Sequence, residues 1–172
     1  AVAYALPLGY RTLGVFKSNQ DGVNYTLIYG ENDIKGTLFF VNLASKVEVV
    51  IDDLTVTGEC NGITMASTAF DVFIFTNGKE VRTVAFTSDD AYASVIEGHN
   101  PVEFSQGYVA TINAEDYEGK ALNWLSMTEW NGFLVVASQY GVNASHQNDV
   151  YTWNDAIFQQ IASVKFTLAI TI

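Results

Sequence analysis

The residues of this chain that could do acid–base chemistry are two histidines and three pairs of adjacent carboxylates. His99 and His146 lie in the turn-like stretches EGHNP and NASHQND, and the pairs are Asp52–Asp53, Asp89–Asp90 and Glu115–Asp116. A glycosidase needs two carboxylates about 5–10 Å apart across its substrate, whereas neighbours on a strand point to opposite faces. Neither histidine accompanies a nucleophile motif. The sequence therefore predicts no catalytic residues and a protein that is not an enzyme.

Metal and cofactor sites find little support. The loops NQDGVN (Asn19–Asn24) and NAEDYEG (Asn113–Gly119) carry oxygen ligands suited to Ca²⁺, but neither has the spacing and terminal Glu of an EF-hand loop. Cys60 is the sole cysteine, and no Cys/His metal spacing occurs. We expect a buried free thiol at Cys60, no metal and no cofactor.

A group of aromatic residues in the last third of the chain is the candidate ligand or interface site. Aromatic faces stack on sugar rings, which makes a carbohydrate site one interpretation. Aromatic side chains at alternating strand positions also pack one sheet against another, which makes a core cluster the other interpretation. The candidate residues are Trp124, Trp130, Trp153, Tyr140 and Tyr151.

Charge and hydropathy narrow the class of protein. The chain has 8 Lys and Arg against 19 Asp and Glu, a net charge of −11. Without a basic patch, specific nucleic-acid binding is not expected. An acidic surface keeps a protein soluble, or it repels a polyanion, as the wall of a DNA conduit would. No apolar run approaches the roughly 18–20 residues of a membrane helix, and no membrane partner is expected.

Strand signals dominate the chain. Short runs rich in β-branched and aromatic residues alternate with turn material. Asn77–Gly78, between two such runs, predicts a hairpin. The other expected strands are Gly9–Phe16, Val23–Gly30, Gly36–Leu43, Lys46–Asp52, Asn61–Thr68, Ala91–Gly98, Gly107–Ala114, Ala121–Met127, Asn131–Gly141, Asp149–Asn154, Ile157–Val164 and Lys165–Ile172.

Two stretches of the chain follow one pattern. DVFIFTNGKEVRTVAF (Asp71–Phe86) is matched by DVYTWNDAIFQQIASV (Asp149–Val164), and NGITMAS and NGFLVVAS precede them. We expect Val72, Phe73 and Phe75 to be equivalent to Val150, Tyr151 and Trp153. Sets of three or four strands with a period of about 35–45 residues are typical of β-propeller blades. The prediction is an all-β, antiparallel, propeller-like fold, with a β-sandwich or jelly roll as the alternative.

The sequence shows no linker that would divide the chain into two domains. No Pro/Ser-rich linker interrupts the chain, and both prolines, Pro7 and Pro101, lie in connections. We expect residues 1–172 to form a single all-β domain or a segment of a larger propeller protein. The apolar run Lys165–Ile172 favours a segment of a larger protein, because an apolar strand left at the edge of a sheet can pair with another chain and aggregate.

One long stretch resembles a known group of proteins. ALNWLSMTEWNGFLVVASQYG…NDVYTWNDAIFQQI (Ala121–Ile161) is similar to the propeller repeats of tailed-bacteriophage tail and neck proteins, of the hub, stopper or nozzle type. Those repeats set a W-N-G-hydrophobic strand before a V-Y-x-W strand, and Glu59–Val81 is similar. Together the two stretches cover 64 of the 172 residues.

The resemblance implies a function. It implies a non-enzymatic structural protein of the virion that forms an oligomeric ring of copies of itself with other virion proteins and lines or closes a DNA conduit. Secreted propellers with a V-Y-x-W repeat also look like this. The alternative is therefore an extracellular module that binds carbohydrate or protein.

Overall fold

The elements of this protein are all strands in the part of the chain that the structure describes. The computed structural model describes residues 4–20, 22–41, 47–66, 71–86, 102–104, 107–112, 114, 121–139 and 141–153. Its strands are β1 (Arg11–Gln20), β2 (Val23–Glu31), β3 (Gly36–Val41), β4 (Val47–Leu54), β5 (Asn61–Ala66), β6 (Asp71–Thr76), β7 (Val81–Ala85), β8 (Val102–Phe104), β9 (Gly107–Thr111), β10 (Trp124–Trp130), β11 (Phe133–Ser138) and β12 (Gly141–Ala144). The expected strands at 91–98, 157–164 and 165–172 lie outside the described residues.

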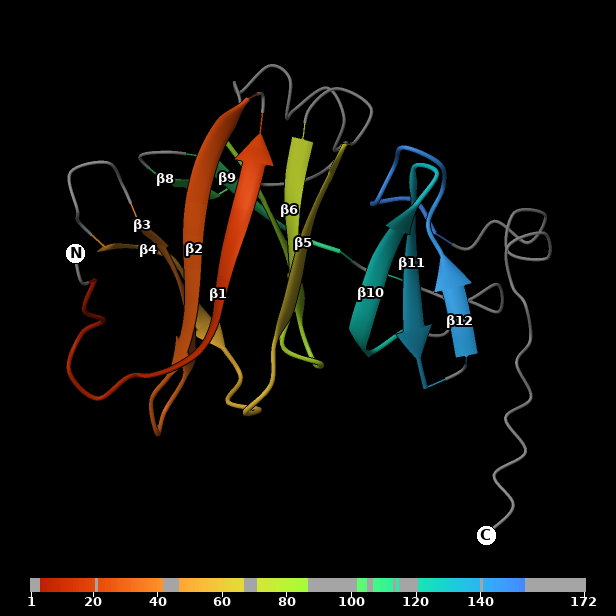
Figure 1. The fold of residues 1–172 in the computed structure, drawn as a ribbon. Coiled ribbons are helices and arrows are strands. Elements are labelled where there is room, and N and C mark those ends of the chain that lie inside the picture. Colours follow the sequence, from red (N-terminus) through yellow and green to blue (C-terminus); the bar gives the residue numbers. More distant parts are fainter. Residues whose placement is uncertain are drawn as a thin grey trace, which may run out of the picture.

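The strands form three antiparallel sheets. The first sheet has the order β1-β2-β3-β4, the second β5-β6-β7-β9-β8 and the third β10-β11-β12. Figure 1 shows the sheets side by side in chain order, from the red and orange strands to the blue ones. The all-β, antiparallel fold class is therefore confirmed, and the first sheet is the four-strand meander that the sequence predicts.

Identical Asn-Gly pairs adopt different structures. Asn77–Gly78 opens the β6–β7 hairpin as predicted, and Thr76 pairs with Val81 across it. Asn131–Gly132 is a two-residue turn between β10 and β11, with φ of 50° and 82°, as a type I′ turn requires. Asn61–Gly62 instead lies within β5 and pairs with β6. The shared Asn-Gly start of NGITMAS and NGFLVVAS is therefore not a shared structure.

The predicted strand at Asp149–Asn154 is wrong for its described part, Asp149–Trp153. The Asp149 carboxylate accepts hydrogen bonds from the backbone N–H of Tyr151 (2.9 Å) and Thr152 (3.3 Å) and from the Thr152 hydroxyl. Trp153 Nε1 donates to the carbonyl of Val150 at 2.8 Å. Such local hydrogen bonds compete with the pairing of the backbone to a neighbouring strand. The expected equivalence with Val72, Phe73 and Phe75 is therefore also wrong, because those three lie in β6.

Strand β6 of the second sheet is buried on both faces. Strand β6 alternates its side chains, as strands do. Phe73 and Phe75 pack into the cluster shared with the first sheet, and Val72 and Ile74 pack into the cluster shared with the third. The three sheets are therefore stacked face to face, with the second in the middle.

The first strands of the three sheets converge. Strand β5 contacts both β1 and β10. At this meeting a Cβ on Gly62 would lie 2.5 Å from the Phe73 ring and 3.1 Å from that of Phe16, so only glycine allows the close approach. Thr64 Oγ1 donates to Ser18 Oγ at 2.9 Å and joins β5 to β1. Converging first strands are a feature of propeller blades, but stacked sheets also occur in sandwiches, and the propeller stays a prediction.

Candidate functional site

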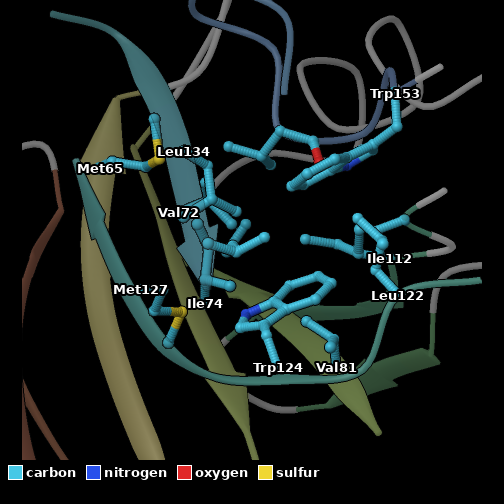
Figure 2. Packing of buried hydrophobic residues seen from close by; sticks show 14 residues of the cluster. Met65, Val72, Ile74, Val81, Ile112, Leu122, Trp124, Met127, Leu134 and Trp153 are labelled. Carbon is cyan, nitrogen blue, oxygen red and sulfur yellow. The ribbon is translucent and has the colours of Figure 1, made fainter. Parts of the chain in front are cut away.

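Two of the candidate tryptophans are packed between the second and third sheets. Trp124 is 2% exposed and Trp153 is 8% exposed. Their ring centroids lie 5.5 Å apart with a tilt of 32°. Figure 2 shows both rings among Val81, Leu122 and other apolar side chains of this cluster. Their faces are used in packing and are not presented to a ligand in solution.

The other aromatic candidates do not join this pair at a surface. The Tyr151 hydroxyl lies 2.9 Å from Thr83 Oγ1, and burial raises the pKa of Tyr151. Trp130, at the end of β10, is 63% exposed, with the Phe133 ring 6.0 Å away. Tyr140 lies outside the described residues. Among the described candidates, only Trp130 offers its side chain to solvent.

A polar site that sequence reasoning missed surrounds the linker Thr55–Cys60, which joins β4 of the first sheet to β5 of the second. Glu31, at the end of β2, is 3% exposed. Its carboxylate accepts hydrogen bonds from the Tyr29 hydroxyl (2.9 Å), Thr57 N (2.8 Å) and Gly58 N (3.0 Å). Arg11 Nη2 lies 3.7 Å away. Donors therefore surround this buried charge.

The second sheet holds the same linker from the β6–β7 turn. Glu80 accepts hydrogen bonds from the backbone N–H and the hydroxyl of Thr55. Asn77, fully buried, donates to Glu80 Oε2 at 2.7 Å and to the Thr55 carbonyl at 2.9 Å. Thr57 Oγ1 donates to the Asn77 carbonyl. We call Glu31, Asn77 and Glu80 the linker clamp.

The electrostatics of the clamp reflect these bonds. Burial raises the pKa of Glu80, but the hydrogen bonds from Thr55 and Asn77 outweigh burial and leave that pKa below its ordinary value. Burial is the larger cause, and the hydrogen bond to Glu31 the smaller one, of a raised pKa at Tyr29. Burial also raises the pKa of the half-buried Cys60 thiol at the end of the linker. The clamp therefore favours ionised Glu80 and neutral Tyr29 and Cys60.

A buried amide joins the first and second sheets at the end of β1. Gln20 is 1% exposed. Its Nε2 donates to the carbonyl of Val84 at 3.0 Å and to Ser18 Oγ at 2.9 Å, and its Oε1 accepts from Phe86 N at 2.8 Å. The amide has partners on both sheets, so it fixes their relative position.

Two hollows border these polar residues. The first, of about 370 Å³, is lined by Gly9, Arg11, Glu31, Asn32, Asp33 and Val56. The second, of about 320 Å³, is lined by Lys79, Glu80, Val81, Arg82, Thr111, Ile112, Ala114, Ala121, Leu122 and Asn123. Glu31 and Glu80 reach these hollows, but their carboxylates already accept several hydrogen bonds from the protein.

Two features are absent from the described part of the chain. There, no group of three or more His, Cys, Asp or Glu side chains could hold a metal ion. No helix among the same residues is long and apolar enough to cross a membrane.

An apolar row crosses the outer face of the first sheet. Val15 pairs with Ile28, Ile28 with Phe39, and Phe39 with Val49, so the four lie side by side on one face. The middle of the row is buried, with Tyr10 packed edge-on against Phe39 at 5.3 Å. Its ends are open, since Val15 is 62% exposed and Val49 51% exposed. We call these four residues the outer row.

Comparisons with known proteins give no relatives for this chain. No protein-family model, no curated protein and no solved structure matches it. The class of protein is therefore defined by the fold and its junctions, as an all-β protein of stacked antiparallel sheets.

Sequence reasoning missed the linker clamp because its residues have ordinary local roles. Glu31 stands in the acidic turn GEND, and Asn77 stands in a hairpin signal. Their partners Thr55, Thr57 and Gly58 are 20 to 27 residues away in the sequence. One signal was present, namely that Glu31 directly follows the strongly apolar run of β2, where a charge at the end of a buried strand needs partners.

Proposed function

We propose that this protein is a non-catalytic structural component that assembles with copies of itself into a ring. The observation that carries the proposal is the use of its buried polar side chains. Gln20, on the first sheet, bonds directly to Val84 and Phe86 at the second sheet. Buried Glu31 and half-buried Glu80 accept hydrogen bonds from the linker that joins the two sheets. Their chemistry is thereby used to hold the sheets in register.

This use of polar groups argues against turnover. A general acid or base needs a lone pair or proton directed at a substrate. The Glu31 carboxylate instead accepts hydrogen bonds from three groups of the protein. The Glu80 carboxylate accepts hydrogen bonds from Thr55 and Asn77. Binding a substrate there would require these bonds to break, at about 1–3 kcal/mol for each buried group left unpaired.

Assembly is supported by the outer row. Strand β6 of the second sheet packs against a neighbouring sheet on each face, whereas the outer row leaves Val15 and Val49 largely open. Stacking a sheet of another copy on this face would bury them, at about 25 cal/mol per Å² of apolar surface removed from water. A ring of copies would repeat, between chains, the packing found within the chain.

A place in a virion tail or neck, lining or closing a DNA conduit, is the more specific part of the proposal. It rests on the net charge of −11 and on the resemblance of Ala121–Ile161 to phage propeller repeats. Of that pattern, the structure has the strand β11 after W-N-G but no strand at V-Y-x-W, Val150–Trp153. An acidic wall repels DNA phosphates and lets them slide past. Tight, salt-sensitive binding of the purified protein to duplex DNA would contradict this part.

The alternative is an extracellular propeller module that binds carbohydrate or protein. The observation that favours it is Trp130, whose ring is 63% exposed next to Phe133. Glycan binding that is lost on Trp130→Ala, by a protein that stays monomeric, would establish the alternative in place of the ring.

The deciding experiment is sedimentation velocity of the purified chain over a range of concentrations. We expect a discrete oligomer, and we expect Val15→Asp with Val49→Asp to reduce it to monomers because two charges then lie in the outer row. Ile34→Asp is the matched control, since Ile34 is apolar and 86% exposed but lies between β2 and β3, outside the row. A monomer at all concentrations would contradict the proposal, as would an oligomer that the row variant leaves intact.

A further inference from the structure

The chain contains three Asn-Gly pairs, at 61–62, 77–78 and 131–132. In this dipeptide the backbone nitrogen of Gly can attack the side-chain carboxamide carbon of the preceding Asn. A C–N bond forms, ammonia leaves and a five-membered succinimide results, which water opens at either carbonyl to give Asp or isoaspartate. Glycine permits the attack because it has no Cβ to obstruct it. The reaction needs a free carboxamide and a backbone that can bend.

The fold denies both conditions to two of the pairs. Asn61 and Gly62 pair with Thr76 and Phe75 inside the second sheet, and Asn61 Nδ2 donates to the Leu125 carbonyl at 2.9 Å. Asn77 is fully buried. Its carboxamide donates to Thr55 and Glu80 and accepts from the backbone N–H of Lys79 and Glu80. Attack at Asn77 would first break these four hydrogen bonds. At Asn61 the carboxamide oxygen already accepts from Gly62 N at 2.8 Å, so protection there comes from the Leu125 bond and from the pairing of both residues with β6.

Asn131–Gly132 meets the first condition, and its backbone is held by turn contacts and not by pairing within a sheet. Asn131 is exposed and Gly132 half-buried in the turn between β10 and β11, where the Gly132 carbonyl accepts from Asn148 N at 2.6 Å. Asn131 is held through its backbone carbonyl, which accepts from Gln147 Nε2 at 2.9 Å. Among the described residues, no hydrogen bond engages its carboxamide. Glu129 Oε1 lies 2.6 Å from Gly132 N, so a carboxylate stands at the atom that must lose a proton when it attacks.

We propose that Asn131–Gly132 is a site of spontaneous deamidation in the folded protein, while Asn61 and Asn77 are protected. The Gly132 proton passes to Glu129, the Gly132 nitrogen bonds to the Asn131 carboxamide carbon, and the departing amide takes up a proton to leave as ammonia. Water is the only co-reactant. The product places a new carboxylate beside Glu129 and the exposed Trp130. The isoaspartate form also lengthens the main chain by one methylene in a turn of only two residues.

The test is incubation of the intact chain at neutral and mildly alkaline pH, followed by peptide mass spectrometry that separates Asp from isoaspartate. We expect Asn131 to react at least roughly tenfold faster than Asn61 or Asn77, because the latter two react only after local opening. In urea we expect the three rates to converge. Equal rates in the folded protein would overturn the proposal, and so would a difference that persists in urea, since local sequence would then explain it.

A variant tests the part assigned to the carboxylate. Glu129→Gln keeps an oxygen that can accept from Gly132 N but removes the basic group. We expect Asn131 to deamidate more slowly in this variant, with Asn61 and Asn77 unchanged. An unchanged rate at Asn131 would overturn the part given to Glu129, and a circular dichroism spectrum like that of the parent chain would show that the fold is retained.

Discussion

The two junctions on either side of the second sheet are built differently. The junction with the first sheet joins aromatic rings to a set of polar groups, which are buried Gln20, Glu31 and Asn77 and half-buried Glu80. The junction with the third sheet is a cluster of aliphatic side chains around Trp124 and Trp153, crossed by fewer polar bonds, such as that from Thr76 Oγ1 to the Trp124 carbonyl at 2.8 Å. One strand, β6, supplies the middle of both.

The difference follows from how the two neighbours approach β6. Toward the first sheet, rings meet in pairs, with Tyr29 4.8 Å from Phe75 and Phe16 5.6 Å from Phe73. The short linker Thr55–Cys60 also crosses there. Although Val56–Glu59 are exposed, the N–H groups of Thr55, Thr57 and Gly58 find acceptors on the two sheets. The clamp supplies those acceptors. Charge therefore enters the first junction, and we expect that junction alone to depend on pH.

The largest effect is expected from removing the Glu31 carboxylate. Glu31→Ala leaves the N–H groups of Thr57 and Gly58 and the Tyr29 hydroxyl without their acceptor. We expect the free energy of unfolding in urea to fall by about 2–4 kcal/mol. Asp33→Ala removes an exposed carboxylate two residues away and should change stability by less than about 0.5 kcal/mol. Similar losses in the two variants would mean that the clamp contributes little.

A smaller, pH-dependent effect is expected at Glu80. Its pKa in the folded protein is below the ordinary value of 4.5, so folding favours the carboxylate. Its contribution to stability is therefore complete above pH 4.5 and is lost as the pH falls through the folded pKa. Urea unfolding at a series of acidic pH values should show a flatter loss of stability in this window for Glu80→Gln than for the parent chain.

The matched control for this prediction is Glu59→Gln, which removes an exposed carboxylate of the same linker. We expect Glu59→Gln to keep the acid dependence of the parent chain. If Glu80→Gln also keeps it, the acid dependence of the first junction does not originate in Glu80.

The sequence predicted the parts of this fold that depend on neighbouring residues. Strands β1 to β4 were predicted because β-branched and aromatic runs alternate with turn residues, and the β6–β7 hairpin because Asn77–Gly78 marks a turn. The error at Asp149–Trp153 has the same origin. The pattern of apolar residues there suits a strand, but the Asp149 side chain bonds the backbone two and three residues ahead, and propensity does not reveal which of the two wins.

The sequence alone could not predict the surroundings of the tryptophans or the linker clamp, because residues far apart in the sequence form them. Trp124, Trp130 and Trp153 look alike in the sequence, yet two are buried between sheets and one is exposed. Which of them faces a neighbour depends on the stacking of the second and third sheets, and local patterns do not encode that stacking. The clamp depends equally on the path of one linker between two sheets.

The smallest expected effect is a difference in stability loss between substitutions of the two buried tryptophans at the junction of the second and third sheets. Both pack in the same cluster, but Trp153 Nε1 donates to the Val150 carbonyl, whereas Trp124 Nε1 is buried without a hydrogen-bond partner in the described part of the chain. Each Trp→Phe change removes similar ring volume. Trp153→Phe also removes the donor of a buried carbonyl, while Trp124→Phe removes a donor that was already unpaired. We therefore expect Trp153→Phe to lower the free energy of unfolding by about 1 kcal/mol more than Trp124→Phe. Urea unfolding with an unchanged m-value measures the difference, and a larger loss for Trp124→Phe would show that packing, and not hydrogen bonding, ranks the two residues.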